Sequence, residues 1–578
     1  MRRKGIVFGT LALGVTVALA ITACSGGAKS TGSGFEACGK HPTTCNSGDR
    51  KDGGELTWAI SAGWDSWNKN RAKGNSVYLA EAVQGILPQI GHFNPDGKWW
   101  WSRDTLKAKP KLVSKNPQAW KYELRDDAKW SDGTPIGVDD FIWHWYSLTS
   151  DKSKCGDCDP AATSYGDEVK SITKDSSGAI VVTLKKGSYD PDWLTKNTIT
   201  YPAHIADKHG KGWKTDPKAM AESSKWFSDN QPDYSGGPYM IKSAKIGQKE
   251  TLVPNPRWYG KIKPTLDKLN LLVVSSQQDM LKALDNGELD GAAPESLDPD
   301  VSEQATGDTG IRSNLAPGPG WEHFDLNVTN KWLKDVKLRE AMLTAIDVDD
   351  VNKRTYGQLT KVKRRDNYLF NQKSPYFKDT FAGSSMGTGD IAKAKKMLSA
   401  AGYKLSGGKL TKDGKQVGPF TYRYLEGHAM RKTTSELVQG YLGKIGIKAN
   451  IKTIAASQLG TVLDKSDFDI VEFGWSTDPA FTTAPQQFWD SKSPSNFGRN
   501  SDKKVDTAIA KVHSTVDLKE AAGFANDAGS LVAKDAYILP VVTTPVLIVT
   551  SKKVVNVRDN WASQIRALYN MEEWGIKK

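Results

Sequence analysis

The first 34 residues constrain the rest of the chain most, because they indicate where the folded body begins and in which compartment it folds. The chain opens with M-R-R-K, continues with an apolar run over residues 5–23, and then has a Gly- and Ser-rich stretch over residues 25–34. This is the layout of an export signal followed by a flexible linker. The apolar run is broken by glycines and is marginal against the ~20 apolar residues of a spanning helix. We therefore expect an exported body that begins near residue 50.

The end of the apolar run predicts a lipid anchor. The tetrapeptide I-T-A-C ends at Cys24 and resembles a bacterial lipobox, in which cleavage before the cysteine leaves its thiol to take a diacylglycerol. The alternative is an uncleaved anchor with a chance cysteine. We expect a signal peptide over residues 1–23 and a flexible tether over residues 24–53. The lipid chains would hold the body at the outer face of the cell membrane, in water.

The charge of the chain is basic but dispersed. The formal net charge is +13, and removal of Arg2, Arg3 and Lys4 with the leader lowers it by three, to +10. There is no run of five or six basic residues and no zinc-finger, helix-turn-helix or RNA-binding signature. Nucleic acid is therefore not expected as a partner. A basic surface beside an anionic membrane explains the charge more simply.

Four cysteines remain after the lipidated one, and an even number outside the cytoplasm indicates disulfides. Three pairings are possible, and we favour the two local loops, Cys38 with Cys45 and Cys155 with Cys158. The motif K-C-G-D-C could also be a redox pair or half of a zinc site. A zinc ribbon needs a second C-x2-C, which Cys38 and Cys45 do not provide. No metal site is predicted.

The mature chain has over 550 residues, too many for one hydrophobic core, so two or three domains are expected. Strand and helix patterns alternate along it, which indicates an α/β protein. We expect strands over residues 54–60 and 120–124. We expect a helix that begins at Asp139 or Asp140, another over residues 390–403 with Asp390 as its N-cap, and a helix, turn and strand over residues 435–451.

Several blocks together resemble one family, the extracytoplasmic solute-binding proteins that serve peptide and nickel ABC importers. The best-known signature of that family resembles Y-E-L-R-D-D-A-K-W-S-D-G-T-P-I-G-V-D-D-F at residues 122–141. The remaining blocks follow in the family's order over about residues 54–578. They are Y-P-A-H-I (201–205), G-G-P-Y (236–239), N-P-R-W-Y-G (255–260), A-L-D-N-G-E-L-D (283–290), D-V-K-L-R-E-A-M-L-T-A-I-D (335–347) and A-K-K-M-L-S-A-A-G-Y (394–403).

The resemblance implies a periplasmic-binding-protein type II fold, with two lobes joined by a hinge and an extra α/β subdomain. The expected first lobe comprises residues 50–95, 233–320 and 541–578, the subdomain residues 96–232, and the second lobe residues 321–540. The implied function is a monomeric, cofactor-free receptor of an ABC importer. It would capture oligopeptides in the interlobe cleft and deliver them to a two-subunit membrane permease.

The resemblance also assigns a ligand contact to W-S-T-D at residues 475–478. In peptide-binding members, an aspartate three residues after a tryptophan receives the α-ammonium group of the ligand, which places that role on Asp478. A buried ammonium needs such a carboxylate, since an unpaired buried charge is very costly. Trp475 would form the pocket wall and Ser476 would lend backbone groups. The alternatives are a simple Asp478-Pro479 turn and a core tryptophan. Some relatives have an arginine at the position of Glu472. In this chain the Glu472 carboxylate would either favour a cationic ligand group in the cleft or face solvent.

Two further segments are candidate contacts. In G-W-E-H-F-D-L-N (320–327), strand alternation puts Trp321, His323 and Asp325 on one face and Glu322 and Phe324 on the other. Asp325 either lines the cleft or closes a hydrogen-bond network at the strand end. The second segment, A-G-W-D-S-W-N, follows the first strand where the family places ligand contacts, and it offers Trp64 and Trp67.

Other ligands and classes remain open. The chain has 20 tryptophans, and tryptophan stacks on sugars as well as packing in cores, so an oligosaccharide or another small solute is the alternative ligand. Nickel would require histidines at ligand spacing, and the 8 histidines show none. An exported hydrolase is the competing class, but there is no H-E-x-x-H, no P-loop and no convincing G-x-S-x-G.

Overall fold

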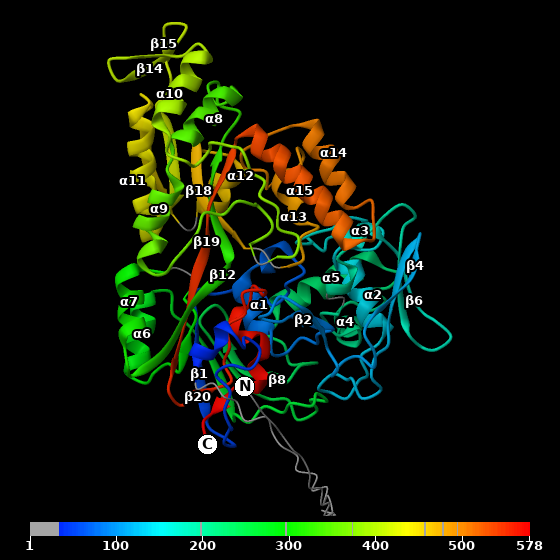
Figure 1. Ribbon diagram of the computed structural model, residues 1–578. Coiled ribbons are helices and arrows are strands. Elements are labelled where there is room, and N and C mark those ends of the chain that lie inside the picture. Colours follow the sequence, from blue (N-terminus) through cyan, green and yellow to red (C-terminus); the bar gives the residue numbers. More distant parts are fainter. Residues whose placement is uncertain are drawn as a thin grey trace, which may run out of the picture.

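The architecture rests on one ten-stranded sheet that runs through the whole molecule. The computed structural model describes residues 34–196, 199–294, 297–372, 374–455, 458–476, 479–493 and 495–578. Strands β12 and β19 are much longer than the others and pair along their length in antiparallel fashion, as Figure 1 shows. The strand order is β17 (Ala449–Ile454), β16 (Phe420–Leu425), β18 (Ile470–Ser476), β12 (Ile311–Leu326), β19 (Ile538–Ser551), β11 (Gly291–Ala292), β1 (Glu55–Ile60), β10 (Lys268–Val273), β9 (Lys249–Pro254) and β8 (Tyr239–Lys245).

Two separate groups of hydrophobic cores divide the molecule along this sheet. One group contains side chains from residues 35–311 and 547–576, and we call this part the lower body. The main core of the other part contains side chains from residues 321–542, and we call it the upper body. The two long strands β12 and β19 cross from one body to the other. They therefore form a continuous connection between the two bodies.

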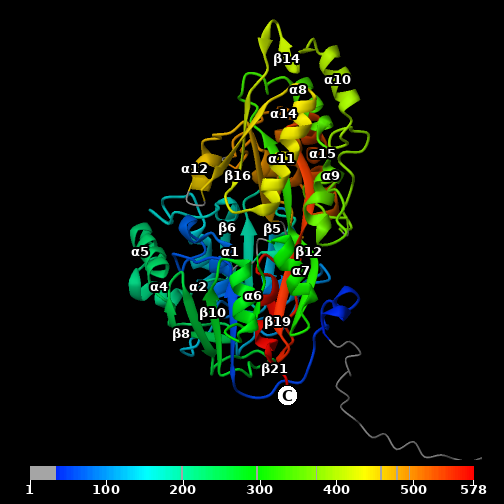
Figure 2. The same cartoon turned by 90° about the vertical axis from the view of Figure 1, so that its left-hand side faces the viewer.

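Helices cover both faces of the sheet. In the lower body, α1 packs near the sheet, α6 and α7 lie on one side, and α2–α5 lie beyond it. Figure 2 shows α4 and α5 to one side of β12 and β19. These helices are α1 (Val77–Val83), α2 (Val138–Ser147), α3 (Ser164–Glu168), α4 (Ala203–His209), α5 (Pro217–Asp229), α6 (Gln277–Asp285) and α7 (Pro299–Gly307).

In the upper body, α8–α11 and α13–α15 lie on opposite sides of the long strands (Figure 1). They thereby bury both faces of the upper strands. Their bounds are α8 (Val336–Ala345), α9 (Val348–Arg354), α10 (Ile391–Ala400), α11 (Ala429–Lys444), α12 (Leu459–Asp464), α13 (Ala484–Trp489), α14 (Lys503–Val512) and α15 (Leu518–Asp535).

Smaller sheets complete the molecule. The largest is a four-stranded sheet in the lower body, which packs with α2–α5 in the same core as β1 and β10. The smaller sheets consist of β4 (Lys111–Lys115), β5 (Gln118–Tyr122), β7 (Ile180–Leu184) and β6 (Val169–Lys174); β2 (Gly91–Phe93) and β3 (Trp99–Trp101); β13 (Lys404–Ser406), β14 (Lys409–Lys412) and β15 (Lys415–Gln416); and β20 (Val554–Val555) and β21 (Gly575–Ile576).

Most of the predicted elements are confirmed, with one local correction. The strand at residues 54–60 is β1, the helix after Asp390 is α10, and the helix, turn and strand over residues 435–451 are α11 and β17. The predicted start of α2 was wrong, because the helix begins at Val138 and Gly137 is its N-cap. The Asp140 carboxylate instead accepts the backbone N–H of Gly137 at 2.7 Å from inside the first turn.

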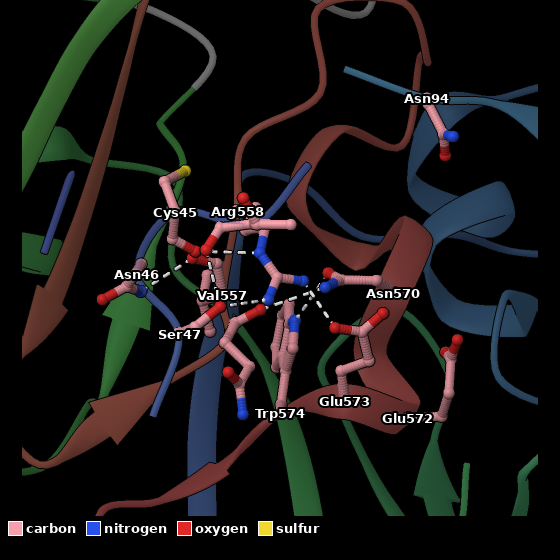
Figure 3. A network of polar contacts seen from close by, with 12 residues as sticks. Cys45, Asn46, Ser47, Asn94, Val557, Arg558, Asn570, Glu572, Glu573 and Trp574 are labelled. Carbon is pink, nitrogen blue, oxygen red and sulfur yellow. Dashed lines mark hydrogen bonds and ion pairs between the residues drawn. The ribbon is translucent and has the colours of Figure 1, made fainter. Parts of the chain in front are cut away.

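The two disulfides are the local loops that the sequence favoured, Cys38–Cys45 and Cys155–Cys158. The first loop packs against the C-terminal segment (Figure 3). Arg558 donates from Nε to the Cys45 carbonyl at 2.8 Å and from Nη2 to the Ser47 hydroxyl at 2.9 Å, and it forms an ion pair with Glu573. Residues 34–53, within the predicted tether, are thus held on the lower body near the C-terminus.

The reversal at residues 236–238 yields a stability prediction. A Cβ atom on Gly237 would lie 2.4 Å from the Gly85 carbonyl oxygen, a backbone atom that cannot move aside. Gly237→Ala should therefore destabilise the protein by about 1–3 kcal/mol in urea unfolding. Gly440→Ala in α11 is the control, because its Cβ would have no neighbour within 4 Å, and it should be neutral or slightly stabilising. Equal stability of the two variants would contradict this close approach.

Candidate functional site

The carboxyl ends of two sets of parallel strands face each other between the bodies. In the lower body β1 is parallel to β10 and β11, and in the upper body β16 is parallel to β17 and β18. β11 and β18 are antiparallel to β19 and β12, which are antiparallel to each other. The carboxyl ends of both sets therefore point into the zone between the bodies. Ligands of open α/β sheets bind outside such ends, so this zone is the candidate site.

A cavity of about 100 Å³ lies in this zone. Its upper wall is the end of β18 and the segment after it, and Gln564 from the C-terminal segment contributes to its lower wall. The lining residues are Leu369, Ser476, Ala480, Phe481, Thr483, Ala484, Gln487, Phe488 and Gln564. Small-molecule sites usually occupy ~300–1,000 Å³. A ligand of several residues would therefore fit only if the two bodies moved apart.

The predicted residues at the end of β18 lie in different environments. Ser476 is exposed and lines the cavity. Trp475 is half-buried and stacks on Phe488, a cavity residue, with ring centroids 4.5 Å apart. It also stacks on Phe497 at 5.8 Å. Asp478 lies outside the described residues, as does Cys24, so both assignments stay predictions.

The other predicted contacts are buried in this conformation. Trp321, His323 and Asp325 share a face of β12, as the alternation predicted, and are at most 3% exposed. His323 Nδ1 lies 2.8 Å from Asp325 Oδ1, and the His323 ring packs against Phe473. Trp64 and Trp67 are buried in the lower core and contact each other edge to face. Within the described part of the chain, the indole N–H groups of Trp64 and Trp321 have no hydrogen-bond partner.

The solvent-facing alternative for Glu472 was wrong, and its role as a cleft contact stays a prediction. Its side chain is 2% exposed and accepts a hydrogen bond of 2.6 Å from the Tyr422 hydroxyl. The physical reason is strand alternation, since Glu472 points away from Trp475, toward the side of the sheet that α11 covers. Burial, and next the nearby Glu322 carboxylate, raise the pKa of Glu472 well above its usual range.

Glu472 lies beside a buried ion pair that the sequence did not reveal. Arg431, in the first turn of α11, donates from Nε and Nη2 to the two carboxylate oxygens of Glu322, each at 2.9 Å. Burial opposes ionisation, but the Arg431 guanidinium lowers the pKa of Glu322. Burial, and next Arg431, lower the pKa of His428 to about 4. The surroundings therefore favour one charge of each sign on the Glu322–Arg431 pair and the neutral form of Glu472.

The raised pKa of Glu472 gives a pH-dependent prediction. An unfolded glutamate releases its proton near pH ~4.3, whereas the folded one keeps it to higher pH, so folding stability falls as pH rises above that value. Glu472→Gln removes this effect and keeps an acceptor for Tyr422. The variant should match the parent in urea unfolding at pH 4.5 and become more stable by up to about 1.4 kcal/mol per pH unit above it. A difference that does not grow with pH would contradict the assignment.

A second buried cation lies on the segment that leads to the cavity. Arg365 is 4% exposed, and its guanidinium lies over the Trp321 ring at 4.9 Å. It donates to the carbonyls of Asn367 and Tyr368 and to the Thr543 hydroxyl, and among the described residues it has no carboxylate ion-pair partner. Burial lowers its pKa to about 9. The sequence signal was weak, since Arg365 is one of several basic residues between Lys361 and Arg365.

No helix within the described ranges has the length and apolar character to cross a membrane. The same residues contain no group of three or more His, Cys, Asp or Glu side chains arranged to hold a metal ion.

Comparison with known proteins agrees with the geometry of the site. Residues 105–497 match the model of the bacterial extracellular solute-binding proteins, family 5. The oligopeptide-binding protein OppA of Mycobacterium tuberculosis is 26% identical over 516 residues, which cover 88% of this chain and 82% of the relative.

Two solved structures are similar along their whole length. The periplasmic EDTA-binding protein EppA is 31% identical, with a TM-score of 0.86, and the match covers 93% of this chain and 99% of EppA. The oligopeptide-binding protein AppA of Bacillus subtilis, in complex with a nonapeptide, is 20% identical with a TM-score of 0.73, over 92% of this chain and 100% of AppA. The predicted periplasmic-binding-protein type II fold is thereby confirmed.

Proposed function

Because the chain belongs to the bacterial extracellular solute-binding proteins of family 5, we propose that it is the substrate-binding lipoprotein of an ABC importer. It captures oligopeptides between the upper and lower bodies and delivers them to the two membrane-spanning subunits of a permease. In this role it releases its ligand unchanged, so it is not an enzyme. The lipid on Cys24 holds it at the outer face of the cell membrane, where it acts as a monomer.

One observation carries the proposal: the carboxyl ends of both parallel strand sets point into the zone between the bodies, and the end of β18 lines the cavity in that zone. The lobes that we propose are residues 50–95, 233–320 and 541–578 for the first, with 96–232 as its subdomain, and 321–540 for the second. Closure of the lobes is a shift of population driven by contacts made only in the closed state.

Recognition of the peptide would depend on its terminal ammonium group and on the polar groups of its backbone. Asp478 pairs with the terminal ammonium, since a charged group taken out of water needs a partner of opposite charge. The peptide backbone pairs with the lobes as an added strand, which leaves the side chains free to vary. The names of the OppA and AppA relatives support a peptide ligand.

A metal chelate or another polyanion is the second candidate ligand. The observation that favours it is Arg365, a buried guanidinium whose charge no described carboxylate offsets. A ligand carboxylate would supply that missing charge. The relative EppA, named as an EDTA-binding protein, supports a ligand of this kind.

The experiment that separates these ligands is native mass spectrometry of the protein without residues 1–24, purified without denaturation. Bodies that enclose a ligand often retain it. A ladder of adducts that sequence as short peptides would support the peptide receptor. A single adduct with the mass of a chelate or a carbohydrate would replace the peptide by that ligand. If the protein carries no adduct, calorimetric titration with a peptide pool, EDTA and an oligosaccharide pool decides between them.

A further inference from the structure

The upper and lower bodies touch at a polar contact beside the cavity. On the lower side is the turn after β7 and on the upper side are the loop before α13 and the end of α14. The Thr482 N–H donates to Asp192 Oδ2 at 2.9 Å. His513 lies between the bodies, with Nε2 3.0 Å from the Thr482 carbonyl and Nδ1 3.3 Å from the Tyr189 carbonyl. Thr483, the next residue, lines the cavity.

The geometry of His513 depends on its protonation. Both ring nitrogens face carbonyl oxygens, which only accept hydrogen bonds. A neutral imidazole has one N–H and one lone pair, so it satisfies one carbonyl and directs a lone pair at the other. The imidazolium donates to both. The hydrogen bonds of His513 to Tyr189 in the lower body and to Thr482 in the upper body therefore form together only when His513 is charged.

The lower side of this contact carries more acidic than basic groups. On the lower side, Asp190 and Asp192 are buried, Lys196 lies 3.5 Å from Asp190, and Glu168 interacts electrostatically with Asp190 and Lys196. Three acids thus face one lysine. On the upper side, the titratable groups are Tyr376, which interacts with Asp192 and Asp517, and Lys511, two residues before His513. Oδ1 of Asp192 has no hydrogen-bond partner among the described residues.

We propose that His513, Asp192 and Thr482 form a proton-dependent clasp that holds the two bodies closed around the ligand. These are positioning residues, since they set how long the ligand stays without touching it. Protonation of His513 stabilises the closed state. The loop of residues 480–484 contains Thr482 and lines the cavity, so this stabilisation acts directly at the cavity wall. The inference rests on the proposed capture of a ligand by closure. It does not depend on which ligand is captured.

Glu168 and Asp192 also take up protons as pH falls, and the test must distinguish this effect from the protonation of His513. Burial, and next Asp190, raise the pKa of Glu168 to about 7, and the same two causes raise the pKa of Asp192. Protonation of these acids as pH falls removes negative charge, which weakens the clasp. The His513 contribution has the opposite sign. A variant of each group therefore distinguishes the two effects.

Closure is measured without any ligand by single-molecule energy transfer between dyes on the two bodies of the full chain, at Lys208→Cys and Lys448→Cys, both exposed positions. Between about pH 8 and 5.5, where histidine takes up its charge, we expect the ratio of closed to open molecules to rise by about tenfold, the scale of one hydrogen bond from a charged donor. His513→Gln should flatten this rise. Asp192→Asn should lower the closed fraction at every pH, and Glu168→Gln should keep the rise.

His209→Gln is the matched control, because His209 is an exposed histidine of the lower body that stacks on Trp226, and it should behave as the parent. A closed fraction that is independent of pH in the parent would overturn the clasp. So would equal pH dependence in the parent and in His513→Gln. Failure of the peptide proposal would appear separately, as the absence of peptide binding in calorimetry with the clasp intact.

Discussion

Asp478→Asn is expected to lower the affinity for a peptide with a free N-terminus by at least tenfold, and by about 2–5 kcal/mol if the ammonium is fully buried in the complex. The reason is the unpaired charge that the substitution leaves in the closed site. The variant should fold normally, since Asp478 follows Ser476, the last paired residue of β18, in the sequence. Isothermal titration calorimetry with one peptide of defined sequence measures the loss.

A chemical change to the ligand makes this test specific. N-acetylation removes the ammonium, so it should weaken binding to the parent by a similar amount and leave binding to Asp478→Asn almost unchanged. Asp527→Ala is the control variant, because Asp527 is exposed on α15 and its nearest cation is Lys378 at 3.7 Å. If acetylation weakens peptide binding equally in the parent and in Asp478→Asn, Asp478 does not receive the ammonium. The turn at Asp478-Pro479 then becomes the better explanation of this residue.

Arg431→Met is expected to destabilise the upper body by about 3–5 kcal/mol, because it leaves the Glu322 carboxylate buried without its partner. Glu322 is 4% exposed, and neutral Glu472 close by cannot replace the guanidinium. Urea unfolding, followed by the near-ultraviolet signal of the many buried aromatic side chains, measures the change. The loss should shrink at low pH, where Glu322 becomes protonated in the variant.

The double variant Glu322→Gln with Arg431→Met distinguishes the effect of losing the whole ion pair from the effect of losing one member. It removes both charges, so it should be more stable than Arg431→Met alone. Lys225→Met supplies the surface control, since Lys225 pairs with Asp229 on the exposed face of α5, and an exposed pair contributes at most about 1 kcal/mol. A double variant as unstable as the single one would mean that Arg431 stabilises the fold by packing alone.

The tryptophan content of the chain has a structural explanation. Several tryptophans are fully buried and pack in the two bodies, among them Trp120, Trp130, Trp143, Trp321, Trp489 and Trp574. The run of three at residues 99–101 is β3, which pairs with β2, and Arg103 lies over the Trp101 ring at 4.9 Å. Composition alone therefore gave a poor guide to the ligand, because it could not distinguish a core side chain from a binding surface.

The sequence by itself determined the local features of this protein. Helix α10 follows from its aspartate cap and apolar spacing. The disulfides Cys38–Cys45 and Cys155–Cys158 close short loops, because the paired cysteines are separated by only 7 and 3 residues in the sequence. The order of the family blocks predicted the fold, because each block is a short sequence motif that can be recognised without knowledge of its contacts in the structure. Strand alternation also placed Trp321 and His323 on one face of β12 and Glu322 on the other.

Only the tertiary structure decided what each of those faces meets. Glu322 meets Arg431 from 109 residues away, and α11 covers the side of the sheet to which Glu472 points, so an acid that could have faced a ligand is a core residue. His513 meets Tyr189 across 324 residues. No local pattern encodes such contacts. They arise when separately patterned segments pack, and the packing sets the burial, the charge and the partners of each side chain.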